Sequence, residues 1–415
     1  MAQQNPFKRF VQNKAGNVAM MTGILLIPMM AAVGAAVDYS RVNSYSNAYQ
    51  QSADAAVLAA SKVRDQLSDT ELKKFARAVF DANLGSEAAK VLNFELYTTG
   101  DNKLALKADG RVDSSFIGIV GIKNMALNVL SEVQLPQGNI EVVLVVDNTG
   151  SMNSSGKIGA LKTAAKNFTN QIMQPRVVQE KRAQIAVVPF SSYVNVGKNN
   201  RNRNWISVPR ESRNKKWHGC VGSRSYPRNL KDEKFGKERV PGLLNVSCVN
   251  EMLTLSRNKN KILQSIQKLT ASGSTYIPAG ISWGVRVLSS KSPFTAGASP
   301  TNIAERKTNQ VMILMTDGEN TISKNRDGRN DSAYHNGRDV GQTNKWTLEA
   351  CTYAKSKAIT VYTVTFGKGL SNATRKLMLN CATSADHYFD ATSGADLDVA
   401  FGKIGAHIKT VYLSR

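Results

Sequence analysis

The sequence is poor in the side chains that most enzymes use for proton transfer. It has only four histidines, His218, His335, His387 and His407, and none is spaced from a nucleophile or an acid in a way that implies a general base. Ser151 is a candidate nucleophile, but the GxSxG turn of a nucleophile elbow does not surround it. Without a catalytic triad or a paired acid/base cluster, the sequence argues against an enzyme.

Cysteine is equally scarce. The four cysteines, Cys220, Cys248, Cys351 and Cys381, all lie in the second half of the chain, and none forms a CxxC pair. An even number in an oxidising compartment fits two disulfides. Proximity favours Cys220 with Cys248 and Cys351 with Cys381, although three pairings are possible. A zinc site made of His218, Cys220 and Cys248 is the alternative, but it lacks a clear fourth ligand.

Acidic residues are few compared with basic ones. The 415 residues include 31 Asp and Glu against 54 Lys and Arg, which leaves a net charge of +23. Such a balance favours acidic partners, namely nucleic acid, anionic lipid or an acidic polymer. No aromatic-rich RNA-binding motif interrupts the charges, and the exported location argued below is unsuited to nucleic acid. We therefore expect no nucleic-acid partner.

One long apolar run lies near the N-terminus. Residues 15–37, between Lys14 and Asp38, carry no charge and are long enough to cross the ~30 Å hydrocarbon layer of a membrane. Basic residues precede the run, so the positive-inside rule predicts a cytoplasmic tail at 1–14 and export of the remainder. A cleaved signal peptide is the alternative, although the run exceeds the roughly 7–15 residues of a usual signal core.

Residues 38–136 are expected to form a helical extension of the membrane helix and a small α+β module. The helix continues to about residue 66. The Ser68-Asp-Thr-Glu71 segment matches a capping box and predicts a second helix that stops at Gly85. Apolar and polar residues then alternate with the period of half-buried strands at 92–97, 103–108 and 125–135.

From residue 139 to 415 the pattern changes to strands that alternate with helices. Residues 140–147 and 311–317 are near-continuous apolar runs that each end in an aspartate, which is typical of strands buried on both faces. The alternation predicts an α/β fold with a doubly wound, mostly parallel sheet. Further strands are expected at 182–190, 359–366 and 387–389, and helices at 157–173, 261–269, 279–289, 344–357, 371–380 and 394–410.

Two polar insertions interrupt this order, at about 195–250 and 319–343. The first holds thirteen basic residues against four acidic ones, together with Trp205 and Trp217. Long loops in compact domains are usually functional or disordered. The first insertion is a candidate for binding an acidic polymer, and the alternative is a solubilising loop tied by a Cys220–Cys248 disulfide.

The aspartates that end the two apolar runs are the best candidates for a ligand site, because ligands of open α/β sheets bind beyond the carboxyl ends of the strands. Asp147 is followed by Thr149 and Ser151 on one turn, Asp317 stands on a second turn, and Thr275 lies on a loop between them. Oxygen-only ligands suit a hard divalent cation, Mg²⁺ first and Mn²⁺ or Ca²⁺ as alternatives. Such an ion keeps waters, one of which an acidic side chain of a partner can replace.

A phosphate-binding loop is the alternative for the first of these segments. The stretch from Gly150 to Lys157 follows a strand and opens a helix. However, five residues separate Gly150 from Gly156 where a P-loop has four, and Ile158 stands where the P-loop needs Ser or Thr.

The three motifs resemble the metal-ion-dependent adhesion site of von Willebrand factor A domains, whose first motif is Asp-x-Ser-x-Ser. Asp147 matches the first acid, Thr149 replaces the middle serine and Ser151 matches the last serine. Thr275 matches the isolated threonine of the family and Asp317 its second acid. The resemblance implies that the three hydroxyls approach the ion, while the two acids act directly or through water. It covers about 140–415, with both insertions unmatched.

The N-terminal part resembles TadE/TadG-like pilus-assembly proteins, in the segments 16–19 (GNVA), 36–41 (AVDYSR), 51–56 (QSADAA) and 58–60 (LAA). The resemblance implies a non-enzymatic, single-pass inner-membrane protein with its A domain in the periplasm. It would assemble or anchor Flp-type (tight adherence) pili by binding a pilus or envelope protein that offers an acidic residue to the metal. The alternative is a surface-exposed adhesin that binds host or matrix ligands through the same domain.

Overall fold

The computed structural model describes residues 15–64, 67–85, 90–100, 103–135, 139–173, 183–236, 238–248, 250–305, 307–324, 326–327, 330–331 and 333–412. The chain divides into two compact units, Met1–Leu135 and Pro136–Arg415. The expected cytoplasmic tail at 1–14 lies outside the described residues.

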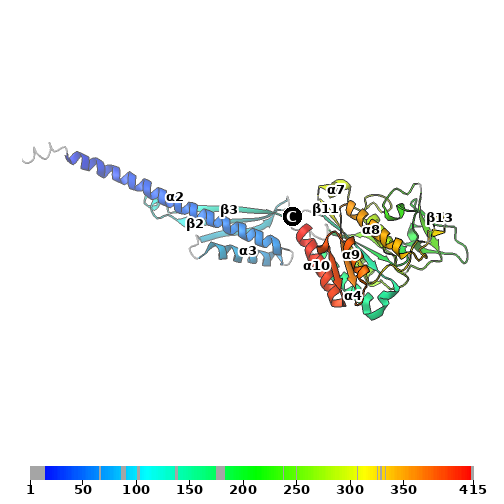
Figure 1. Ribbon diagram of the computed structural model, residues 1–415. Coiled ribbons are helices and arrows are strands. Elements are labelled where there is room, and N and C mark those ends of the chain that lie inside the picture. The colour runs from blue at the N-terminus through cyan, green and yellow to red at the C-terminus, as the bar shows by residue number, and fades with distance from the viewer. Residues whose placement is uncertain are drawn as a thin grey trace, which may run out of the picture. The chain divides into compact units, whose positions relative to one another are not determined.

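Helix α2 (Ala15–Val63) is continuous from the apolar run into the first unit and includes Pro28. The side chains of Met20, Ile24 and Ile27 are exposed, and the N-terminal part of the helix extends alone beyond the strands of its unit (Figure 1). Within the described residues this is the one helix that is long and apolar enough to cross a membrane, and only 6% of its apolar window is buried. The predicted helix at 39–66 is confirmed to Val63.

The second half of α2 packs on the remainder of its unit. Its buried face repeats at helical spacing through Tyr49, Ala53 and Ala60, and Phe80 of α3 lies edge-on to Tyr49 with ring centroids 5.5 Å apart. The predicted capping box is present, because the Ser68 hydroxyl accepts from a backbone N–H while the carboxylate at N3 accepts from the cap. The other elements are α3 (Asp69–Leu84), η1 (Ile117–Val120) and an antiparallel sheet of β1 (Lys90–Thr98), β2 (Lys103–Asp113) and β3 (Asn124–Gln134).

Asp38, the first charged residue after the apolar run, connects α2 to η1. Its buried carboxylate accepts hydrogen bonds from the backbone N–H groups of Ser115, Phe116 and Ile117 at 3.0, 2.7 and 2.8 Å. These bonds, led by that from Ile117, lower the pKa of Asp38. Asp38 therefore both ends the apolar run and holds the start of η1 against α2.

The second unit contains a six-stranded sheet formed by described residues. In sheet order its strands are β10 (Leu253–Ser256), β5 (Ala183–Phe190), β4 (Asn139–Asp147), β11 (Thr308–Thr316), β14 (Ile359–Phe366) and β15 (Tyr388–Ala391). All neighbours pair in parallel except β10, which is antiparallel to β5. The predicted α/β fold with a mostly parallel sheet is confirmed, whereas the sequence pattern did not reveal the short strand β10.

Helices cover both faces of this sheet, which explains the apolar runs. Along β4, Val142 and Leu144 join the core on one face, while Val143 and Val145 join the core on the other. One face is covered by α4 (Lys157–Ile172), α5 (Lys259–Gln267) and α10 (Gly394–Tyr412), and in Figure 1 α4 and α10 lie side by side. The other face is covered by α6 (Ile277–Leu288), α8 (Val340–Ser356) and α9 (Asn372–Cys381), and a short helix α7 (Pro300–Ala304) precedes β11.

The first insertion, which the sequence suggested to be a long polar loop, is a folded part of the second unit over its described residues. Its sheet has the order β6 (Val194–Asn195), β8 (Trp217–Val221), β9 (Val240–Leu244) and β7 (Ile206–Ser207). Trp205 and Trp217 are buried in the same core as α6. The described part of the second insertion contains a short hairpin of β12 (Arg326–Asp327) and β13 (Asn330–Asp331).

Two buried arginines hold the segment 228–234 of the first insertion, and one of them, Arg286, joins it to α6. Arg224 donates to the backbone carbonyls of Arg228 and Lys231, and Arg286 of α6 donates to the carbonyls of Asn229 and Lys231. Burial, with the nearby Arg224 charge, lowers the pKa of Arg286 to about 9. The segment 228–234 is therefore held both by the nearby Arg224 and by Arg286, which lies more than fifty residues away in sequence.

Both disulfides that proximity favours are present. Cys220 is bonded to Cys248 within the insertion, and Cys351 of α8 is bonded to Cys381 at the end of α9. The alternative zinc site is wrong, because both of its cysteines are in a disulfide.

Candidate metal site

The candidate site lies where β4 and β11 end, side by side in the middle of the sheet. The chain starts at β4, moves outward to β5 and β10, and then crosses back to β11 on the opposite side of β4. The strand order therefore reverses between β4 and β11, and this switch point is where open α/β sheets bind ligands. Asp147 is the last residue of β4, and Asp317 follows β11 directly.

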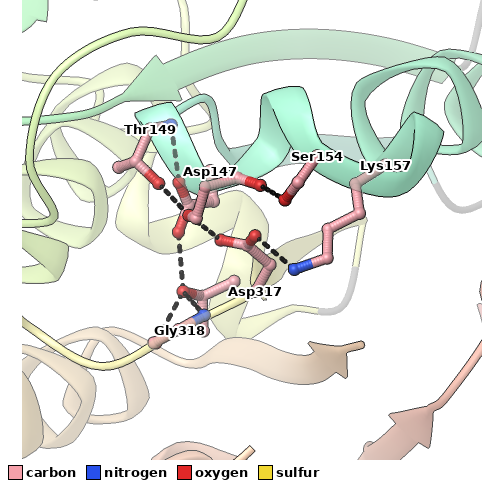
Figure 2. A network of polar contacts seen from close by, with 8 residues as sticks. Asp147, Thr149, Ser154, Lys157, Asp317 and Gly318 are labelled. Carbon is pink, nitrogen blue, oxygen red and sulfur yellow. Dashed lines mark hydrogen bonds and ion pairs between the residues drawn. The ribbon is translucent and has the colours of Figure 1, made fainter. Parts of the chain in front are cut away.

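Four of the five residues expected from the sequence form one chain of hydrogen bonds. The Thr149 backbone N–H donates to Asp147 Oδ1 at 2.8 Å, and the hydroxyls of Thr149 and Ser151 lie 2.9 Å apart. The Ser151 hydroxyl donates to Asp317 Oδ1 at 2.6 Å, so the chain crosses from one strand end to the other (Figure 2). These side chains reach each other across 166 residues of sequence.

The third loop is fixed to the first one through the backbone. The Gly150 N–H donates to the Gly273 carbonyl at 2.9 Å, two residues before the fifth expected residue, Thr275. Gly273 has a φ of +89°, a conformation that favours glycine. Thr275 is buried and exchanges two hydrogen bonds with Thr321, since its N–H donates to the Thr321 hydroxyl and its carbonyl accepts from the Thr321 N–H.

Three further residues of the site were missed by the sequence reasoning. The Thr316 hydroxyl donates to Asp147 Oδ2 at 2.7 Å, and the Lys157 ammonium donates to Asp317 Oδ2 at 2.8 Å. Thr321, the third, holds Thr275. A threonine before Asp317 was visible in the sequence, but a hydroxyl inside an apolar strand gives no sign of its partner. Lys157 was considered only as a phosphate ligand.

Both acids of the site are shielded from water. Asp147 is fully buried, and the side chain of Asp317 is 0% exposed whereas that of Lys157 is 20% exposed. Burial and, second, the nearby charge of Asp317 raise the pKa of Asp147 to about 6, although hydrogen bonds from Thr316 and Thr149 act in the opposite direction. Two neighbouring buried carboxylates repel each other, so a cation at this edge of the sheet would be bound favourably.

The donor set fits a hard divalent cation. Two carboxylates and the hydroxyls of Thr149, Ser151 and Thr275 provide only oxygen, which Mg²⁺ and Mn²⁺ accept together with waters. Among the described residues, no group of three or more His, Cys, Asp or Glu side chains offers an alternative metal site. An ion here therefore depends on the hydroxyls as well as on the two acids.

The other chemistries considered for these residues find less support in the geometry. Lys157 contacts a carboxylate, and the segment before it is an irregular 3₁₀ turn, η2 (Gly150–Gly156). The Ser151 hydroxyl donates to Asp317. The buried His335 bonds instead to the Ser223 hydroxyl and the Ser192 carbonyl, and burial lowers its pKa to about 4.

Comparison with protein families gives a match in the N-terminal region. Residues 16–66 match the Tad family model, described as Flp pilus-assembly TadE/G-like. The match covers the apolar part of α2 and its continuation into the first unit. Comparison with curated proteins finds no relative of significant sequence similarity.

Solved structures with partial similarity include pilus proteins and von Willebrand factor A domains. The pilus adhesin SpaC of Lactobacillus rhamnosus GG is 15% identical with a TM-score of 0.42, and the match covers 78% of this chain but 34% of SpaC. The von Willebrand factor domain of the type V pilus tip protein of Porphyromonas gingivalis is 12% identical with a TM-score of 0.43 and covers 68% and 97% of the two chains. A mussel byssus proximal thread matrix protein with a zinc-occupied metal-ion-dependent adhesion site is 14% identical, with a TM-score of 0.35 and coverages of 65% and 45%.

The raised pKa of Asp147 predicts a pH dependence of stability in the presence of a chelator. The folded protein holds a proton on Asp147 up to about pH 6, whereas the unfolded chain releases it near pH 3.8. The free energy of unfolding should therefore fall as pH rises from about 4 to about 7, by on the order of 2–3 kcal/mol. Urea unfolding of the full chain at a series of pH values measures this. Asp147→Asn should flatten the profile, and equal slopes in both proteins would contradict the prediction.

Proposed function

We propose that this protein is a non-enzymatic envelope protein that assembles or anchors Flp-type (tight adherence) pili. The observation that carries the proposal is the match of residues 16–66 to the TadE/G-like Flp pilus-assembly family model. The exposed apolar part of α2 supports membrane anchoring by a single helix. The oxygen-lined site at the carboxyl edge of the second unit supports a binding role for the part that follows.

We place α2 in the bacterial inner membrane, with residues 1–14 in the cytoplasm and both units in the periplasm. Basic residues flank the apolar run on its N-terminal side, which the positive-inside rule assigns to the cytoplasm. Two disulfides in the second unit suit an oxidising compartment.

The second unit binds its partner through a divalent ion, for which the oxygen ligands favour Mg²⁺. The residues that would hold it are Asp147, Thr149, Ser151, Thr275 and Asp317. Hydroxyls and two acids leave part of the coordination sphere to water. A carboxylate on a pilus or envelope protein replaces one water and completes the contact. The same contact on the cell surface, with a host or matrix ligand, is the competing adhesin function.

The first insertion supports a second binding function, toward an acidic polymer. Five exposed cations between residues 198 and 215 have no ion pair among the described residues, whereas Arg201 and Lys216 share Glu211. η3 (Lys198–Asn200) packs on β8, and the backbone of Trp217 donates to Glu211, so the segments that carry these cations are neighbours. The five are Lys198, Arg203, Arg210, Arg213 and Lys215. A compact group of unpaired cations attracts polyanions, and salt screens the attraction.

Metal titration tests the first site. Mg²⁺ or Mn²⁺ should raise the melting temperature of the full chain in detergent, because an ion that binds only the folded state stabilises it by about 2.7 kcal/mol at a hundredfold excess over Kd. Asp147→Ala should abolish the shift. Asp386→Ala, which removes an exposed acid before the amino end of β15, is the matched control and should keep it. Equal shifts in all three proteins would reject the site.

Protease protection separates the periplasmic role from the adhesin role. In intact cells we expect the second unit to resist external protease, and to be degraded once the outer membrane is permeabilised, because the barrier rather than the fold protects it. A cytoplasmic protein serves as the control and should remain intact in both cases. Degradation in intact cells would favour the adhesin.

Retention on a heparin column tests the basic insertion. Changing Lys198, Arg203, Arg213 and Lys215 to Ser should lower the salt concentration at which the full chain elutes, because each exposed cation contributes to polyanion binding. The control removes four other charges, at Lys73, Lys74, Lys162 and Lys166, and should elute close to the wild type. Equal loss in the two variants would mean that net charge, and not this surface, causes retention.

A further inference from the structure

Lys157 places a positive charge inside the proposed metal site. Its ammonium lies 2.8 Å from Asp317 Oδ2, while Ser151 occupies Oδ1 of the same carboxylate. Figure 2 shows the side chain reaching from the first turn of α4 to Asp317. Since Asp317 is buried, this ion pair is largely shielded from solvent and competing salt.

The surrounding backbone fixes the path of the lysine side chain. Ser155 and Gly156, directly before α4, both have positive φ, at 54° and 68°, so the chain turns sharply before the helix begins. Gly367, which follows β14 and has a φ of +126°, lies close to the end of the lysine side chain. A Cβ atom at Gly367 would lie 3.3 Å from both Cε and Nζ of Lys157. A side chain at position 367 would therefore be in tight contact with the end of the lysine side chain.

The positive charge of Lys157 compensates the same buried carboxylates that a divalent ion would compensate. Asp147 and Asp317 are buried neighbours, and such a pair is stable only with a compensating positive charge or a proton. An ion held by the hydroxyls of Thr149 and Ser151 would share Asp317 with the ammonium. Two cations within a few ångströms repel each other strongly where water is excluded.

We propose that Lys157 is a tethered cation that competes with the divalent ion for Asp317, stabilising the metal-free site and weakening metal binding. The inference rests on the proposed metal site. Lys157 holds Asp317 until an ion takes over that oxygen, so the site fills only at an ion concentration set by this competition. A lysine that merely anchored the start of α4 would leave metal affinity unchanged.

Mn²⁺ binding to the full chain in detergent tests this, with free Mn²⁺ measured by its electron paramagnetic resonance signal. Lys157→Met removes the charge and keeps most of the apolar stem. We expect it to bind Mn²⁺ at least tenfold more tightly than the wild type. Lys157→Arg retains the charge and should stay within about threefold of the wild type. Lys166→Met, on an exposed position of α4, is the matched control and should not change the affinity.

Thermal unfolding gives a second readout that does not depend on partner binding. With a chelator, Lys157→Met should melt below the wild type, because its two acids lack a cation, and saturating Mn²⁺ should raise its melting temperature by more than that of the wild type. Equal or weaker Mn²⁺ binding by Lys157→Met would overturn the inference. If Asp147→Ala binds Mn²⁺ as well as the wild type does, the metal site itself is refuted, so the two failures are distinguishable.

Discussion

The site depends on one constraint, the burial of two carboxylates at the ends of adjacent parallel strands. Parallel pairing of β4 with β11 brings Val146 opposite Met315, so the residues that follow, Asp147 and Thr316, meet at the same edge. Asp317 comes one residue later. The backbone N–H of Thr149, the hydroxyls of Ser151 and Thr316, and the charge of Lys157 compensate these acids. The pairing of the strands thus places two negative charges close together, and residues on the following loops and on α4 compensate them.

In the first unit, a single helix, α2, has two parts with different surroundings. The N-terminal part of α2 exposes apolar side chains on all sides, whereas its continuation has a single buried face against α3 and the small sheet. Asp38 lies where the exposed apolar part of α2 gives way to the packed part. Its carboxylate accepts three hydrogen bonds from backbone N–H groups and holds η1 at this point. The helix is unbroken from the apolar run into the module.

The sequence predicted what local patterns determine and missed what distant contacts determine. Apolar runs ending in Asp147 and Asp317 were enough to predict the parallel strands and to select the acids. The capping box at Ser68 was recognisable because its partners are three residues apart. In contrast, β7 pairs with β9 across more than thirty residues in one ladder of two residue pairs, so no periodicity in the sequence marks it. The role of Lys157 depends on Asp317, 160 residues away, and no spacing rule connects them.

In the proposed function, the charges of the site would couple metal binding to partner binding. With both acids ionised, Asp147, Asp317 and Lys157 together carry one negative charge, which disfavours a second carboxylate. A divalent ion would reverse the sign of that sum and would make the approach of an acidic side chain favourable. Without the lysine, the loaded site would be neutral and the attraction weaker. The ammonium that we propose to compete with the ion would still be tethered to α4 after the ion replaces it on Asp317, and would then raise the positive charge presented to an acidic partner.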